Sequence, residues 1–250
     1  MALHKSPAIV IKSSNVGEAD KIISFFSKRF GKVRALAKGV RRLKSKLVGN
    51  LQPITLVELI YFARQRQDLA RINSCDIIYS FPGIKADFEK IKRGYYVLEL
   101  IDIIIPEGGL EPKLFTTLIR FLRLMEKPEN IQNMDSLVRL FEWQILAYSG
   151  FRPRLEQCVF CKKAPGENAA AFSIVSGGLL CNRCSVQVSD AININPETLI
   201  FIKKAPETDL ANGVNWWLPE KLNKELKEIA QRYFSCYLGK DIKTAKFLAL

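Results

Sequence analysis

Two short cysteine motifs, Cys158-Val159-Phe160-Cys161 and Cys181-Asn182-Arg183-Cys184, stand 19 residues apart in the chain. Two C-x2-C pairs at this separation are typical of zinc sites. Zinc prefers four tetrahedral ligands, and each C-x2-C turn presents two thiolates from one short piece of backbone. Four cysteines leave no coordination position for water. We therefore expect one structural Zn²⁺, held by Cys158, Cys161, Cys181 and Cys184.

Disulfide bonds and a redox pair are the alternative uses of these cysteines. Disulfides are typical of secreted proteins, but residues 1–7 contain no apolar segment of a signal peptide. A thioredoxin-like pair would open a helix in a βαβ unit, and neither motif has that setting. Cys75 and Cys236 lie in apolar patterns, and we expect both to be small buried hydrophobic residues.

Length and composition indicate a globular protein of the cytoplasm. The 250 residues suffice for two domains, or for one domain with a small module, and 48% of them are hydrophobic. The best candidate for a membrane span, residues 95–105, is short and is interrupted by Glu99 and Asp102. We therefore expect no association with a membrane.

Positive charge is concentrated in the first third of the chain. The formal net charge is +13, and residues 1–80 hold 15 Lys and Arg against 5 Asp and Glu. A run of cations without a carboxylate precedes Glu58; it consists of Lys28, Arg29, Lys32, Arg34, Lys38, Arg41, Arg42, Lys44 and Lys46. A solvated surface normally mixes both signs, so this run favours a polyanionic partner.

Residues 1–80 show the pattern of a small β-barrel. Apolar or alternating runs separated by turn residues predict five strands, at residues 8–13, 21–27, 32–38, 54–62 and 69–79. Five short strands in about 80 residues fit the oligonucleotide-binding (OB) fold. An SH3-like barrel is the alternative.

The third predicted strand carries cations on one face. Side chains alternate along a strand, so Lys32, Arg34 and Lys38 point one way while Val33 and Ala35 point the other. Such a row, continued by a basic loop, can follow a phosphate backbone. The residues expected to contact nucleic acid are Lys32, Arg34, Lys38, Arg41, Arg42, Lys44 and Lys46.

Aromatic residues near this row are candidates for base stacking. Phe25 and Phe26 are adjacent and point to opposite faces of the second strand, so only one of them is expected in the core. Phe30, at the tip of the following hairpin, is expected to be the more exposed ring.

After residue 80 the apolar period becomes helical. Long helices are predicted at residues 85–105, 113–125, 134–149 and 219–238; Gly239 ends the last, and Asn195-Pro196 begins another. The chain is therefore predicted to be an α+β protein. An N-terminal five-stranded OB-fold barrel (1–80) precedes a helical domain (81–250), into which a four-cysteine zinc finger is inserted at about residues 155–190.

Residues suited to catalysis are scarce. The single histidine is His4, and the chain has no GxxxxGK[ST] phosphate-binding loop. Glu99 and Asp102 lie one helical turn apart, a spacing more typical of a salt-bridging face than of an acid–base pair. We expect a non-enzymatic protein. The alternatives are a zinc-containing RNA-binding protein of the translation or transcription machinery and a nucleic-acid enzyme with a concealed site.

Several stretches carry a family resemblance: Ile9-Val10-Ile11-Lys12, Gly17-Glu18-Ala19-Asp20-Lys21-Ile22, Gly31-Lys32-Val33, Ala37-Lys38-Gly39-Val40-Arg41-Arg42, Leu51-Gln52-Pro53 and Leu238-Gly239-Lys240. With them the chain resembles the bacterial RecO family of DNA repair and recombination mediators over nearly its whole length. The resemblance implies binding of single- and double-stranded DNA and annealing of complementary strands. It also implies cooperation with RecR in loading RecA, in the bacterial cytoplasm and at the nucleoid.

The same resemblance implies binding of the acidic, apolar C-terminal tail of single-stranded-DNA-binding protein (SSB). Such a tail needs cations beside an apolar cleft. One predicted helix supplies Arg120 and Arg123 next to Leu122 and Leu124, and Arg139 on another helix is a further candidate. We expect the tail to bind at these residues.

Overall fold

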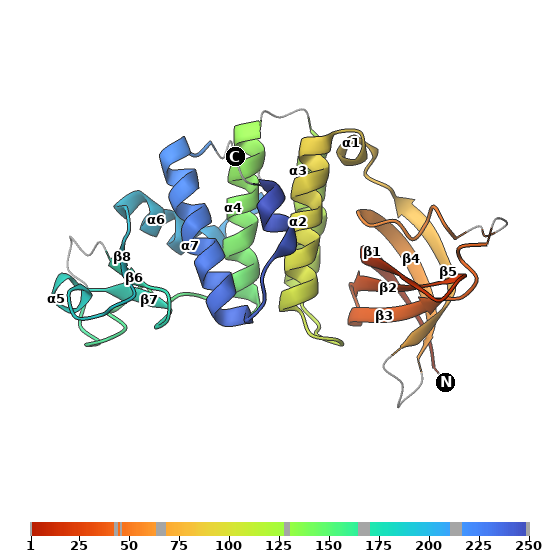
Figure 1. The fold of residues 1–250 in the computed structure, drawn as a ribbon, viewed down its shortest axis with the longest axis horizontal. Coiled ribbons are helices and arrows are strands. Elements are labelled where there is room, and N and C mark those ends of the chain that lie inside the picture. Colours follow the sequence, from red (N-terminus) through yellow and green to blue (C-terminus); the bar gives the residue numbers. More distant parts are fainter. Residues whose placement is uncertain are drawn as a thin grey trace. The chain divides into compact units, whose positions relative to one another are not determined.

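The computed structural model describes residues 2–42, 45, 47–63, 69–127, 131–164, 171–210 and 217–248, and of residues 131 and 132 the backbone alone. Its contacts divide the chain into two compact units (Figure 1). Unit 1 comprises Met1–Pro128 and Ile242–Leu250, and unit 2 comprises Glu129–Asp241. The helices that directly follow the barrel thus share a unit with it, and the chain returns to this unit at its C-terminal end.

Unit 1 begins with a closed five-stranded barrel. The strands are β1 (Ala2–Val16), β2 (Asp20–Ser27), β3 (Gly31–Ala37), β4 (Thr55–Ala63) and β5 (Ala70–Tyr79). Their order around the barrel is β1-β2-β3-β5-β4, with β3 parallel to β5 and the other pairs antiparallel. This five-stranded barrel has the predicted OB-like architecture. Strand β1 is longer than expected because it pairs with β2 and β4 in succession, from Ala2 opposite Ala63 onwards.

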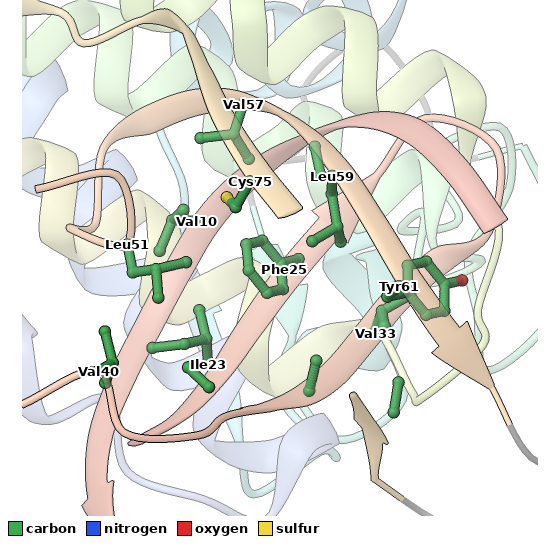
Figure 2. Packing of buried hydrophobic residues seen from close by; sticks show 14 residues of the cluster. Val10, Ile23, Phe25, Val33, Val40, Leu51, Val57, Leu59, Tyr61 and Cys75 are labelled. Atoms are coloured by element: carbon green, nitrogen blue, oxygen red, sulfur yellow. The ribbon is translucent and has the colours of Figure 1, made fainter. Parts of the chain in front are cut away.

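Alternate side chains of the strands fill the barrel. Figure 2 shows Phe25 at the centre of this core, between Val10, Ile23 and Leu59. Cys75 belongs to the same cluster, as expected for a small hydrophobic residue, and burial raises the pKa of its thiol to about 12.

Helices complete unit 1. They are α1 (Pro82–Lys85), α2 (Phe88–Ile104), α3 (Pro112–Glu126) and the C-terminal 3₁₀ helix η3 (Lys243–Leu248). Helix α2 begins at Asp87, whose carboxylate accepts hydrogen bonds from the backbone N–H groups of Glu89 and Lys90. Glu99 accepts hydrogen bonds from residues 243 and 244 and so holds η3 against α2.

The outer face of the barrel is buried as well as its interior. Phe25 lies in the barrel core, and Phe26 is equally buried on the opposite side of β2, where its ring centroid is 5.8 Å from that of Phe115 in α3. The expectation that only one of the two rings is buried was therefore wrong. Phe30 also folds back, with its ring centroid 4.6 Å from the His4 ring and 6.0 Å from the Tyr61 ring.

Asp102 ties α2 to two strands of the barrel. Its carboxylate oxygens lie 3.1 Å from Lys12 Nζ in β1 and 3.1 Å from Lys32 Nζ in β3. Burial raises the pKa of Asp102, but the two ammonium groups outweigh burial and hold the pKa below its ordinary value. The salt-bridging role predicted for the Glu99–Asp102 face is confirmed for Asp102.

The start of β3 is closed by the loop that joins α2 to α3. The Gly108 N–H donates to the Lys32 carbonyl at 2.9 Å. Gly31 has φ +64°, and a Cβ at this position would collide with the Gly109 carbonyl oxygen. A side chain at residue 31 would therefore push the loop away from the barrel.

Unit 2 combines a three-stranded sheet with helices (Figure 1). Its elements are α4 (Ile131–Tyr148), β6 (Ala171–Ser173), β7 (Gly178–Leu180), α5 (Asn182–Ser185), β8 (Ala191–Asn193), α6 (Pro196–Lys204), the 3₁₀ helix η1 (Ala205–Glu207) and α7 (Glu220–Leu238). Two predicted helix boundaries are confirmed: Asn195 caps α6, and Gly239, with φ +58°, ends α7. The single helix predicted at residues 85–105 is instead divided into α1 and α2, and α4 begins three residues before the predicted start at residue 134. The sheet order is β7-β6-β8.

We expect Asp102→Asn to lower the free energy of unfolding by about 2 kcal/mol at neutral pH, because it leaves the buried Lys32 ammonium without a counter-charge. Urea unfolding monitored by circular dichroism measures this difference. Since the pKa of Asp102 is lower in the folded than in the unfolded state, its stabilisation is complete above the unfolded pKa and is lost as the pH falls through the folded pKa. The difference in the free energy of unfolding between parent and variant should therefore become smaller at acidic pH.

Glu107→Gln serves as the control, because the Glu107–Arg34 pair is far more exposed and should contribute less than about 1 kcal/mol. Equal costs for the two substitutions, or a gap that widens in acid, would contradict the role assigned to Asp102.

Candidate metal centre and nucleic-acid interface

The four cysteines of the two C-x2-C motifs converge on one point of unit 2. Their sulfur atoms all lie within 4.8 Å of one another, and Cys161 Sγ is 3.8 Å from Cys181 Sγ. A tetrahedron with zinc–sulfur bonds of about 2.3 Å has edges of about 3.8 Å, so the arrangement fits a tetrahedral metal ion. All four thiols are free, which argues against the disulfide alternative.

Each motif is shaped by backbone hydrogen bonds. In the first, the Lys162 N–H donates to the Cys158 carbonyl at 2.9 Å, and Lys162 adopts φ +62°. In the second, the N–H groups of Cys184 and Ser185 both donate to the Cys181 carbonyl at 3.0 Å. These tight turns bring the two cysteines of each motif onto the same side of the backbone.

The electrostatics of the cluster favour metal-binding thiolates. Burial raises the pKa of Cys158, but backbone N–H groups, including those of Cys161 and Cys181, outweigh burial and lower the pKa to about 6. Burial and the neighbouring thiols raise the pKa of Cys184 to about 12. A hydrogen bond from the backbone N–H of Cys184 lowers the pKa of Cys181 as well. Thiolates are therefore favoured at Cys158 and Cys181, and a bound cation would favour ionisation of Cys184 too.

The zinc-finger module has little apolar material of its own. Besides two of the cysteines, its buried cluster consists of Val159, Ala171 and Leu180. Sheets of three-residue strands around so small a core are not expected to hold their shape without a cross-link or a metal ion. The cluster of sulfur atoms thus occupies the position where a metal would do most for folding.

Cys236 differs from the expectation for it. Its side chain is exposed, because the buried stripe of α7, which includes Leu226, Ile229 and Tyr233, ends at Phe234. The apolar pattern of the sequence therefore predicted burial further along this helix than the structure shows.

Two members of the predicted cationic row are engaged within unit 1. The Lys32 side chain is only 10% exposed and is paired with Asp102, while Arg34 Nη1 lies 3.0 Å from Glu107 Oε1. This face of β3 therefore meets α2 and the loop after it rather than open solvent. The sequence showed that side chains alternate along β3, but not which carboxylates pair with its cations. The spacing of Glu99 and Asp102, typical of a salt-bridging face, was the one sequence feature that pointed to such a pair.

The cations that follow β3 are exposed. Lys38, Arg41 and Arg42 lie on the surface in the loop between β3 and β4, and within the described part of the chain no carboxylate pairs with them. The loop is shaped by its contacts with the β1–β2 turn: the Gly39 N–H donates to Asp20 Oδ1 at 2.7 Å, and Arg41 Nη1 donates to the Gly17 carbonyl at 3.2 Å. Lys44 and Lys46 lie outside the described residues.

Net charge separates cleanly between the two units. Residues 129–241 hold 13 Lys and Arg against 13 Asp and Glu, so the whole excess of +13 belongs to unit 1. The exposed loop with Lys38, Arg41 and Arg42 lies in the charged unit. Long-range attraction of a polyanion is therefore directed to the unit that contains the barrel.

The three arginines considered for the SSB tail have different surroundings. Arg120 and Arg123 are exposed on α3. Tyr79, an exposed ring, shares that surface: a hydrogen bond to Glu126 raises its pKa, and Arg123 lies close enough to lower it. Arg139 is 2% exposed, with Nη1 2.9 Å from Glu142 Oε2 in the same helix, and so is not presented to a peptide.

Comparison with known proteins identifies the family. Residues 1–81 match the family described as Recombination protein O N terminal, and residues 85–246 match Recombination protein O C terminal. In the described residues, no helix is long and apolar enough to cross a membrane.

Relatives match the chain almost end to end. A DNA repair protein RecO from Alkaliphilus metalliredigens is 33% identical over 90% of this chain and 92% of its own length. One from Acetivibrio thermocellus is 30% identical over 98% of this chain and 95% of its own, and one from Pelotomaculum thermopropionicum is 29% identical over 99% and 94%. These matches agree with the OB-like barrel and the four-cysteine cluster, and they show that the chain belongs to the RecO family of DNA repair and recombination proteins.

Proposed function

We propose that this protein binds single- and double-stranded DNA and anneals complementary strands. We also propose that, with RecR, it helps RecA to load onto DNA coated by SSB in the bacterial cytoplasm, at the nucleoid. The exposed loop with Lys38, Arg41 and Arg42, on a barrel that belongs to the unit with all the net charge, is the observation that carries this proposal. Family membership supports the role in repair and recombination.

Phosphate contact is assigned to the loop first. Lys38, Arg41 and Arg42 need no rearrangement to meet a phosphate backbone, and Lys44 and Lys46 continue the same basic sequence. Arg34 is half-exposed and stands at the border of this surface. Lys32 would have to leave Asp102 to reach DNA, so we assign it mainly to holding α2 on the barrel.

The metal is proposed to be one structural Zn²⁺. Cys158, Cys161, Cys181 and Cys184 supply four thiolates at tetrahedral spacing, which suits zinc and leaves no position for a reacting water. When bound, the ion acts as a cross-link between the two motifs. We propose that the protein is not an enzyme and acts by holding strands and partners.

Protein purified without chelator should contain one zinc per chain by emission spectroscopy, and Cys181→Ser should lose it. Metal binding in small zinc modules is worth on the order of 10 kcal/mol. Hydrogen exchange should therefore accelerate at residues 157–164 and 171–185 in the variant but not in the barrel. Cys236→Ser, at the exposed cysteine, is the control and should keep its zinc. A parent protein without zinc would refute the assignment.

Replacing Lys38, Arg41 and Arg42 with Ala should weaken binding to all DNA sequences alike. Each phosphate contact to a single strand contributes about −0.7 to the slope of log K against log salt, so the triple variant should flatten that slope by about 2. Fluorescence anisotropy over a salt series measures it. The matched control replaces Lys203, Lys204 and Lys221 of unit 2, which changes the net charge equally. Equal losses for the two triple variants would contradict a local contact.

Annealing is proposed to need no nucleotide hydrolysis, because base pairing itself supplies the free energy. The barrel holds one strand while the surface with Arg120 and Arg123 holds an SSB tail, so the second contact becomes effectively intramolecular. Complementary oligonucleotides coated by SSB should then anneal without any nucleoside triphosphate, in a fluorescence-quenching assay. SSB without its tail, or Arg120→Ala with Arg123→Ala, should slow the reaction. An absolute ATP requirement would refute annealing without nucleotide hydrolysis. An annealing rate that does not depend on the SSB tail would refute the proposed contact with that tail.

A further inference from the structure

The first cysteine motif presents an exposed aromatic ring beside the metal centre. Phe160 is 61% exposed, although it lies between two cysteines of the cluster. Its neighbour Val159 is buried, and the Val159 N–H donates to the Leu179 carbonyl at 2.8 Å, which anchors the motif to β7. The motif thus turns one side chain inward and one ring outward.

The local fold uses the backbone of Phe160 but not its ring. The backbone N–H of Phe160 donates to Cys158 and helps to lower the pKa of that thiol, a contact that any residue other than proline could make. Among the described residues no ring contact to Phe160 is found. No ring–ring contact in the described residues therefore accounts for an aromatic residue here.

Cations flank the ring on both motifs. Lys162 and Lys163 follow the first motif, and Arg183 occupies the second at the position equivalent to that of Phe160. All three side chains are exposed, and the sulfur cluster brings the two motifs together. Zinc with four thiolates carries two negative charges, so the three cations leave this tip with a small positive charge. Contact with a polyanion here is permitted electrostatically but would gain most of its free energy from the ring.

We propose that the tip formed by Phe160, Lys162, Lys163 and Arg183 is a second contact for single-stranded DNA, in which the Phe160 ring stacks on an unpaired base. An exposed ring on a metal-fixed turn loses little conformational freedom when a base stacks on it. Arg183 and the lysines meet the adjacent phosphates. This inference rests on the proposed DNA-binding function and adds to it a site in the neutral unit.

The test compares Phe160→Ala with the parent full-length protein, using a fluorescein-labelled oligo(dT) and a duplex of the same length. Zinc content is measured in every sample, so that loss of the metal is detected. Loss of one stacked base should raise the dissociation constant for oligo(dT) at least about fivefold. Binding to the duplex should not change, because its bases are already stacked. The salt dependence of binding should also stay the same, because the lost contact is not ionic. Phe160→Trp should bind oligo(dT) with the affinity of the parent, because it keeps an aromatic ring at this position.

Phe88→Ala is the matched control. Phe88 is a 73% exposed ring in α2 of unit 1, with Lys92 Nζ 5.2 Å from its centroid. The Phe88→Ala variant should bind oligo(dT) with the same affinity as the parent. Parental affinity of zinc-loaded Phe160→Ala, or an equal loss for oligo(dT) and duplex, would overturn the inference. The triple variant of Lys38, Arg41 and Arg42 tests the barrel contact separately, so failure at Phe160 leaves the proposed function standing.

Discussion

The packing of helices α2 and α3 against the outer face of β1, β2 and β3 is the constraint on which the rest of unit 1 depends. It covers part of the outer face of these strands, so that Phe25 and Phe26 are buried on opposite sides of one strand. A cation on a covered face must find a carboxylate, and Asp102 meets this need for Lys32. Cations without such a partner, such as Arg42, are left for the loop, where solvent or a phosphate can receive them.

In unit 2 the apolar cluster that directly surrounds the four cysteines is small, and the other buried residues of the sheet, such as Phe172, pack against helix α7 instead. With the proposed Zn²⁺ the sulfur cluster would supply a cross-link between the two motifs, although it brings four ionisable thiols together. Backbone N–H groups lower the pKa of Cys158 and Cys181, and the proposed metal ion would stabilise all four thiolates together. The Phe160 side chain, on the turn of the first motif, is exposed and takes no part in the buried cluster around the cysteines.

The sequence was sufficient for features that depend on local spacing. The barrel strands, the cap at Asn195 and the end of α7 follow from periods or turns within a few residues, and the meeting of the two cysteine motifs follows from their spacing. It was not sufficient where burial depends on a distant segment. Alternation along β3 shows that Lys32 and Val33 face opposite ways, but not that a helix some 70 residues later covers the polar face. The same limitation applies to Arg139, whose basic character alone suggested a surface that the packing of α4 denies it.

The division of charge between the units suggests how a strand can be both held and released. Ionic contacts at the Lys38–Arg42 loop would persist when a strand becomes a duplex, because the phosphates remain. A base stacked on Phe160 is different, because pairing with a complementary strand returns that base to a duplex stack and removes it from the ring. On this proposal annealing itself ends the second contact, while the first retains the product until RecR, RecA or salt displaces it. If the protein hydrolyses no nucleotide, as proposed, the free energy of pairing would drive release from the tip and so give direction to the exchange.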